Sequence, residues 1–152
     1  MTEDRDEVRV HLIEQWMSKG DYDLSVAALI MESMPDATEA IGFHLQQAAE
    51  KYLKAFLTLM DQQPPHTHDL QALRSLVALI DADLAEQVQP LGALNPFAVI
   101  YRYPGDAPNV DRDHLEELRT ETARLRDTVV TRIAAAGEKT DGESTVDEGG
   151  AP

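Results

Sequence analysis

Residues 43–56 read FHLQQAAEKYLKAF, and this stretch indicates both the fold of the chain and where functional groups gather. Apolar side chains recur through and beside it at helical spacing, which predicts one face of a helix packed into a core. Three polar side chains, His44, Gln47 and Lys51, follow one another at spacings of three and four. We therefore expect one helix with a core face and a chemically functional face. The apolar set is Ile41, Leu45, Tyr52, Leu53, Phe56 and Leu59.

The sequence on either side predicts where this central helix begins and ends. Asp36 or Thr38 is expected to be its N-cap, because both side chains can accept a hydrogen bond from the first free backbone amides. The helix is expected to continue to about residue 61. Pro64 and Pro65 then prevent its continuation, since proline lacks the amide hydrogen that a helix interior needs.

Other helices are expected to surround the central one. Residues 10–32 carry helical apolar spacing, with a bend or an interruption at Gly20. Residues 97–103 have strand-like composition but no partner strand, so we expect an extended segment packed on the bundle. Short connections between helices predict an all-α, antiparallel, up-and-down bundle of about five helices. The remaining helices are expected from about residue 67 to 80, from 82 to 94, and from Asp111 or Asp113 to 133.

The composition fits one small domain with an acidic tail. The chain has 152 residues, 43% of them apolar, which suffices for one core that we place in residues 10–136. Residues 137–152 have almost no apolar side chains, so this segment is expected to be disordered. Cysteine is absent, and no apolar run approaches the roughly 20 residues needed to cross a bilayer. We expect a cytoplasmic protein with no membrane partner.

The net charge limits the class of partner. A formal charge of −15 disfavours a surface for broad, sequence-independent nucleic-acid binding, which depends on lysine and arginine replacing counterions. Any RNA contact is therefore expected to be local. An acidic protein with one confined basic site is more typical of binding a basic partner or a small phosphate ligand.

Three motifs together resemble the HEPN family of small helical domains: the central stretch, His68-Asp69-Leu70 and Arg102-Tyr103-Pro104. The match runs in order, without a large gap, over about residues 16–133. The resemblance implies a helical bundle, a homodimer, and an association with nucleotides, RNA or minimal nucleotidyltransferases. The family contains ribonuclease toxins, nucleotide-binding modules and non-catalytic partners of nucleotidyltransferases, so the resemblance leaves the activity open.

The polar face of the central helix is the first candidate site. Imidazole can transfer a proton, an amide can orient a ligand, and an ammonium can neutralise a phosphate, so His44, Gln47 and Lys51 suit a nucleotide or partner site. HEPN sequences carry a pattern similar to residues 44–51 at this place. The alternative is a solvated or dimer-facing stripe, in which Glu50 and Lys54 make an ordinary i,i+4 pair.

A pair of histidines follows the central helix. His66 and His68 lie beside Asp69, but histidines in this spacing supply at most two metal ligands and the sequence indicates no third, so no metal site is expected. We expect Thr67 or Asp69 to cap the next helix while His68 packs or bonds against its neighbour. Since HEPN sequences have a similar histidine-aspartate pair, His68 remains a weaker candidate for the site.

Arg102 is the strongest single candidate. Its guanidinium offers a fixed fork of donors for phosphate, and the flanking phenols of Tyr101 and Tyr103 can stack on a base or ribose. The alternative is that Arg102 is paired with one of the many carboxylates. Arg102 and Tyr103 are therefore predicted to bind a nucleotide or a partner.

The sequence departs from the ribonuclease members of the family. Those members carry an arginine followed about four to six residues later by a histidine at the start of the last helix. Here Arg102 is followed by Tyr103, and the next histidine, His114, lies too far along. Arg5 and His11 have a permitted spacing but lie at the wrong end of the chain, and about one such match is expected by chance in a sequence with this many arginines and histidines. The toxin-like ribonuclease mechanism is therefore in doubt.

These observations lead to one functional hypothesis and two alternatives. Phosphate-binding glycine loops and the GxSxG, HExxH and EF-hand patterns are absent, so no cofactor is expected. We expect a nucleotide-binding or partner module that acts with a separately encoded minimal nucleotidyltransferase in a toxin–antitoxin-like pair, without chemistry of its own. The first alternative is a metal-independent endoribonuclease that uses Arg102 with His44 or His68. The second is a purely structural dimer.

Overall fold

The chain is all-α in the computed structural model, which describes residues 2–99, 105–106 and 108–146. No strand occurs within these ranges. The expected helical bundle is confirmed. Its long helices are α1 (Thr2–Ser33), α2 (Thr38–Leu59) and α5 (Arg112–Val146), and its short ones are α3 (Leu70–Ala78), α4 (Ala82–Gln87) and the 3-10 helix η1 (Gln89–Ala98).

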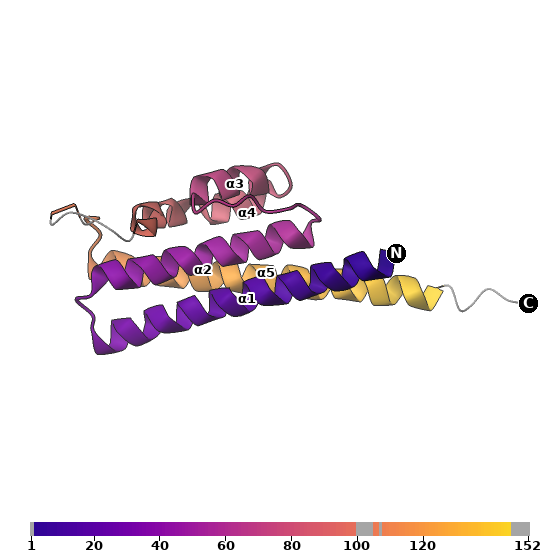
Figure 1. The fold of residues 1–152 in the computed structure, drawn as a ribbon, viewed down its shortest axis with the longest axis horizontal. Helices are drawn as coiled ribbons and strands as arrows, with labels where there is room; N and C mark the ends of the chain where they lie inside the picture. Colours follow the sequence, from indigo (N-terminus) through magenta and orange to yellow (C-terminus); the bar gives the residue numbers. More distant parts are fainter. Residues whose placement is uncertain (1, 100–104, 107, 147–152) are drawn as a thin grey trace, which may run out of the picture.

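The three long helices form the body of the bundle. Figure 1 shows α1, α2 and α5 running lengthwise, with α3, α4 and η1 together along one side of α2. α2 contacts α1, α5, α3 and η1, so the helix that contains the FHLQQAAEKYLKAF stretch is the central element. α1 and α2 run in opposite directions, and the short helices lead the chain back before α5 begins, as expected for an up-and-down bundle (Figure 1).

The predicted apolar stripe of the central helix forms most of its buried face. Burial of each such side chain stabilises the fold by roughly 1.5–3 kcal/mol, so α2 contributes strongly to the core. Leu59, in the last turn, is only partly buried. The five members that are almost completely buried are Ile41, Leu45, Tyr52, Leu53 and Phe56.

Gly20 does not interrupt α1, although the sequence predicted a bend or an interruption there. The helix continues unbroken through this position, which is buried. A Cβ atom at Gly20 would lie 2.6 Å from Cε1 of the Tyr52 ring, closer than real Cβ contacts allow. The glycine is therefore needed for the close approach of α1 to α2.

Replacing Gly20 with alanine should lower the free energy of unfolding by about 1–2 kcal/mol. Alanine gains up to about 1 kcal/mol of helix propensity, but overpacking a filled core costs about 1–3 kcal/mol, and the Tyr52 ring cannot retreat without losing its contacts. Urea unfolding measures the effect. The matched control is Gly137→Ala on α5, where a Cβ would meet nothing within 4 Å, and this variant should not be destabilised. A stabilised Gly20→Ala protein would contradict the assignment.

Several predicted helix ends are confirmed and others are wrong. Asp69 caps α3 by accepting from the Gln71 amide at 2.9 Å, and Asp111 accepts from the His114 amide at 2.8 Å at the start of α5. Neither Asp36 nor Thr38 caps α2, because Ala37 occupies the N-cap position and no side chain bonds there.

The prediction of one continuous helix over residues 82–94 is also wrong. α4 ends at Gln87, and the chain continues as η1 through residue 98. Pro90, in the first turn of η1, has no amide hydrogen for a longer α-helix, and the tighter geometry bonds Leu91 N to Val88 O at 3.0 Å. Phe97 thus lies in a helical turn, 3% exposed, and extended backbone begins only at Val99. Residues 100–103, over which an extended segment was also expected, lie outside the described residues.

The last helix extends into the predicted tail. α5 continues to Val146, ten residues past the expected domain end at residue 136, and Gly137, Glu138 and Lys139 on it are exposed. Exposed residues of this kind add little stability to a helix in water, so disorder of the tail in solution stays a prediction. Residues 147–152 lie outside the described residues.

Candidate functional site

A buried carboxylate lies at the centre of the candidate site. The Glu50 side chain on α2 is 1% exposed. His68 Nδ1 lies 2.6 Å from one of its oxygens and Lys51 Nζ donates to the other at 2.7 Å. Lys54 Nζ lies 3.7 Å from the second oxygen. Because a carboxylate oxygen only accepts, Nδ1 of His68 carries the proton in this pair and Nε2 is the remaining ring nitrogen.

Two glutamines extend this arrangement along α2. Gln46 is 0% exposed and its Nε2 donates to the backbone oxygen of His68 at 2.8 Å. Gln47 Nε2 donates to Gln46 Oε1 at 2.6 Å, and Gln47 Oε1 accepts from Lys51 Nζ at 3.0 Å. The α2 motif and the histidine-aspartate motif therefore meet in one network. We call its six residues the Glu50 cluster: Gln46, Gln47, Glu50, Lys51, Lys54 and His68.

The residues after His68 are fixed from the other side by η1. Asn95 Nδ2 donates to Asp69 Oδ1 at 2.9 Å, and Asn95 Oδ1 accepts from the Leu70 amide at 2.9 Å. The hydrogen bond from Asn95, followed by that from the Gln71 amide, holds the pKa of Asp69 below its usual value. The predicted roles of this segment are thus confirmed: Asp69 caps α3, and His68 bonds to the neighbouring helix.

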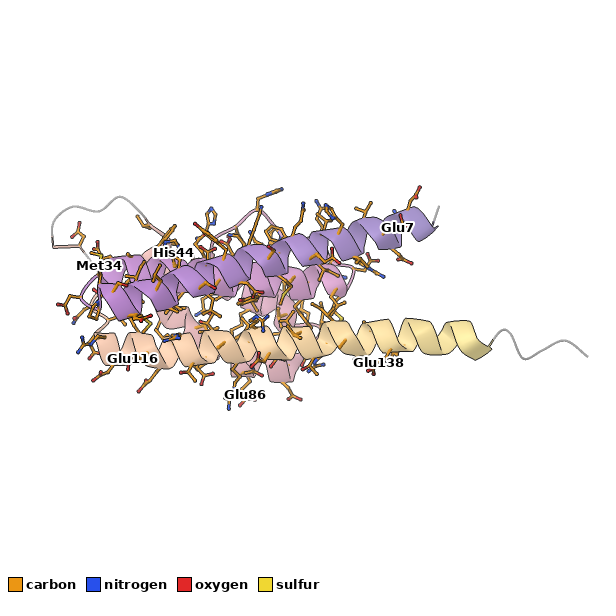
Figure 2. The ribbon with its side chains drawn as sticks, turned by 90° about the horizontal axis from the view of Figure 1, so that it is seen from below. Glu7, Met34, His44, Glu86, Glu116 and Glu138 are labelled. Atoms are coloured by element: carbon orange, nitrogen blue, oxygen red, sulfur yellow. The ribbon has the colours of Figure 1, made fainter. Side chains whose placement is uncertain are left out.

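His44 does not bond to Gln47 or Lys51, although the sequence placed all three on one polar stripe of the helix. Its Nδ1 lies 2.9 Å from Asp23 Oδ1 on α1, and its side chain is 24% exposed. In Figure 2, His44 lies toward the end of the bundle that carries Met34 and Glu116. The structure therefore divides the predicted stripe into a His44–Asp23 pair and the Glu50 cluster.

The inner edge of the Glu50 cluster contacts the only tryptophan of the chain. Lys54 Nζ lies 5.4 Å from the centre of the Trp16 ring, a favourable distance for a cation–π contact. Burial lowers the pKa of Lys54 from its usual value, although the Glu50 carboxylate opposes this change. The i,i+4 pair of Glu50 and Lys54, part of the alternative interpretation of this stripe, exists, but both side chains are buried within the chain and are not solvated.

The strongest candidate from sequence cannot be placed. Arg102 and Tyr103, together with Tyr101, lie outside the described residues. Their predicted role in binding a nucleotide or a partner stays a prediction.

A second polar network was missed from the sequence. Tyr52 donates its hydroxyl hydrogen to Asp21 Oδ1 at 2.6 Å, and Arg126 Nε donates to the same oxygen at 2.7 Å. The network joins all three long helices. Burial, and then the bond to Asp21, raise the pKa of Tyr52 far above its usual value. The polar tip of Tyr52 on a core stripe was the available signal, since a buried phenol normally needs a partner.

This network predicts a pH dependence of stability. Burial acts to raise the pKa of Asp21, but its bonds to Arg126 and Tyr52 outweigh it, so the folded-state pKa lies below the usual 3.8. A carboxyl with a lowered folded-state pKa stabilises the fold above its unfolded pKa and loses that effect as pH falls. Asp21 is 42% exposed, so we expect less than about 1 kcal/mol.

The measurement compares urea unfolding of the wild type with that of Asp21→Asn over a range of pH. The difference in unfolding free energy should be constant above about pH 5 and should shrink below about pH 4. A difference that is the same at all pH values would show that Asp21 does not act through its charge.

Two further observations concern the described part of the chain alone. There, no three histidine, aspartate or glutamate side chains come close enough together to hold a metal ion. No helix there is both long and apolar enough to span a membrane.

Comparison with known proteins identifies the family. The family model named HEPN domain matches residues 13–133, from α1 to α5. The chain belongs to the HEPN family. A crystal structure of an archaeal HEPN homologue matches with a TM-score of 0.61 and 19% identity, covering 80% of this chain and 97% of that one. At this identity the match shows a shared HEPN fold alone. A search of curated proteins finds no match.

Proposed function

We propose that this HEPN domain is a binding module that acts with a separately encoded minimal nucleotidyltransferase, in a toxin–antitoxin-like pair. It binds a nucleotide, or it completes the nucleotide site of its partner, and no chemistry of its own is required. The proposed contact residues are His44, Gln47, Lys51, Arg102 and Tyr103. We further propose that it acts as a homodimer in the cytoplasm.

The observation that carries the proposal is that both carboxylate oxygens of Glu50 already have bonding partners. Its two oxygens are bound by His68 and Lys51, so the carboxylate is not available as a general base. The charge is buried at 1% exposure, whereas Lys51 is 15% and His68 is 71% exposed. The cluster thus keeps its negative charge inside, with Lys51 and the His68 ring nearer solvent. Such an arrangement favours binding of a phosphate over proton abstraction by a carboxylate.

Mass spectrometry of the natively purified protein tests this function. A tagged chain is expressed in its own cells and recovered gently, and the co-purifying proteins and small molecules are identified. We expect a stoichiometric nucleotidyltransferase or a bound nucleotide. A clean chain with neither would contradict the proposal.

Replacing Arg102 with alanine should weaken binding of the partner or the nucleotide by about tenfold or more, since a charge-assisted contact to phosphate contributes at least about 1.4 kcal/mol. The thermal unfolding midpoint should be unchanged. Binding is measured by isothermal titration calorimetry with the recovered partner or nucleotide. Unchanged affinity would remove Arg102 from the site.

A metal-independent endoribonuclease is the second candidate, and the Glu50–His68 contact is the observation that favours it. A buried carboxylate that orients an imidazole by Nδ1 leaves Nε2 to transfer protons, and an arginine can stabilise charge on the scissile phosphate. RNA cleavage in the presence of EDTA that is lost in both Arg102→Ala and His68→Ala would support this function. Cleavage that persists in both variants would indicate a contaminating nuclease.

A further inference from the structure

Large apolar side chains lie at the surface where α3 ends and the chain turns into α4. Both helices lie on the side of α2 away from α1 (Figure 1). Leu79 is 84% exposed, Ile80 is 42% exposed and Leu76, in the last turn of α3, is 37% exposed. Turns at a protein surface are usually built from small and polar residues. A group of exposed apolar side chains in such a place is typical of an interaction surface.

These three side chains border a hollow of about 270 Å³, which we call the Leu79 hollow. Leu57 of α2, which is 0% exposed, lines it from inside the bundle, and Gln62 and Gln63 line it from the segment after α2. Its volume lies just below the range of small-molecule sites, about 300–1,000 Å³. An apolar side chain of a partner protein is the more suitable occupant, since such anchors commonly fill pockets at interfaces.

The turn beside the hollow is held in place by hydrogen bonds. The Ile80 amide donates to the Val77 oxygen at 2.9 Å at the end of α3. Asp81 then caps α4 by accepting from the Leu84 amide at 3.0 Å, and it binds Arg132 of α5 at 2.9 Å. A surface that is already ordered loses little conformational entropy when a partner binds. The exposed apolar side chains are therefore presented in a preformed arrangement.

The charge beside the hollow is negative and uncompensated. Asp83 follows Ile80 by three residues, and Glu86 follows Asp83 by three, which places both carboxylates on one face of α4. Both are exposed, and neither forms an ion pair with another described residue. Glu86 lies at the margin of the molecule in Figure 2. Residues 75–101 contain no lysine, arginine or histidine, so no cation from this segment offsets the two charges.

We propose that the Leu79 hollow docks a segment of another protein that presents an apolar side chain flanked by lysines or arginines, as a cationic amphipathic helix does. The apolar side chain enters the hollow, and the cations lie opposite Asp83 and Glu86. A central apolar anchor with complementary charge at the rim is the usual anatomy of a protein interface. None of the described residues assigned to the proposed nucleotide site lines this hollow, so the inference goes beyond the proposed function.

Isothermal titration calorimetry with two synthetic peptides tests the kind of partner. The first is an amphipathic helix of leucine and lysine, and the second carries glutamate at every lysine position. We expect saturable one-to-one binding of the lysine peptide and binding of the glutamate peptide that is about tenfold or more weaker, because its charges face Asp83 and Glu86. Equal affinity for the two peptides, or no binding of the lysine peptide, would overturn the proposal.

A substitution in the apolar part places the peptide. Leu79→Ser should raise the Kd of the lysine peptide by about tenfold or more, because most of this side chain is free to be buried by a partner. The matched control is Leu29→Ser on α1, where the side chain is 60% exposed, and it should change the Kd by less than about twofold. An unchanged circular dichroism spectrum verifies the fold of each variant. Full affinity of Leu79→Ser would remove the peptide from this hollow and overturn the proposal.

Substitutions of the acids separate a local contact from the general attraction of a cationic peptide to an acidic chain. Asp83→Asn with Glu86→Gln should raise the Kd by about threefold or more, whereas Glu116→Gln with Glu117→Gln, an equal charge change on exposed positions of α5, should change it by less than about twofold. Equal effects of the two pairs would show general attraction and overturn the proposal. Sedimentation of the chain alone gives the last arm: self-association that Leu79→Ser abolishes would assign the hollow to a second copy and also overturn it.

Discussion

Replacing Glu50 with alanine should lower the free energy of unfolding by about 3–5 kcal/mol, the usual cost of removing one partner of a buried ion pair. Lys54, 7% exposed, and Lys51, 15% exposed, would lose their carboxylate and remain largely out of water. His68 would lose the bond that ties the start of α3 to α2. One substitution therefore affects both the fold and the candidate site.

Chemical denaturation in urea measures this effect, and two further variants locate its cause. Glu116→Ala, at an exposed position of α5, should change the unfolding free energy by no more than about 0.5 kcal/mol. Glu50→Gln keeps the shape and one acceptor and should be less destabilising than alanine. If Glu50→Ala unfolds like Glu116→Ala, the carboxylate does not hold the cluster together.

Replacing Tyr52 with alanine should be equally damaging, at about 3–5 kcal/mol, the range found for large aromatic side chains in cores. The ring is completely buried and fills the space that Gly20 leaves on α1. Its hydroxyl bonds to Asp21, which also binds Arg126 on α5. The loss combines a cavity between α1 and α2 with a weakened connection to α5.

A series at this position separates packing from hydrogen bonding. Tyr52→Phe keeps the ring and should lose only about 0.5–1.5 kcal/mol, the net value of one hydrogen bond. Tyr22→Ala is the matched control, because that side chain is 69% exposed, and it should be close to neutral. A Tyr52→Phe variant as unstable as Tyr52→Ala would show that the hydroxyl, and not the ring, dominates.

Much of the fold followed from local chemistry. The apolar period of residues 41–56 predicted the buried face of α2 because that face requires only helix geometry and a core. The cap at Asp69 was predictable because its bond partner lies two residues away. Gly20 was misread because the reason for it, the Tyr52 ring, is 32 residues distant in the sequence and adjacent only in space.

The candidate site was less predictable, because its decisive contacts join distant segments. Lys51 and Gln47 were found from helical spacing, but the role of Glu50 depends on His68, which is 18 residues away. A signal was present in the sequence. Leu53 and Leu57 follow Glu50 by three and seven residues, which places the carboxylate on the apolar face of the helix. A charge in that position is buried, and a buried charge needs partners.

The most direct measurement of the central claim is the amount of nucleotidyltransferase or nucleotide that mass spectrometry recovers with the wild-type chain and with Lys51→Ala. We predict a stoichiometric partner or ligand on the wild type and about tenfold less or none on the variant, because Lys51 is the more exposed of the two lysines at the Glu50 carboxylate, at 15% against 7% for Lys54. Arg119→Ala should behave as the wild type. A wild-type chain that carries neither partner nor nucleotide, and that cleaves RNA in EDTA, would contradict the account and identify a ribonuclease.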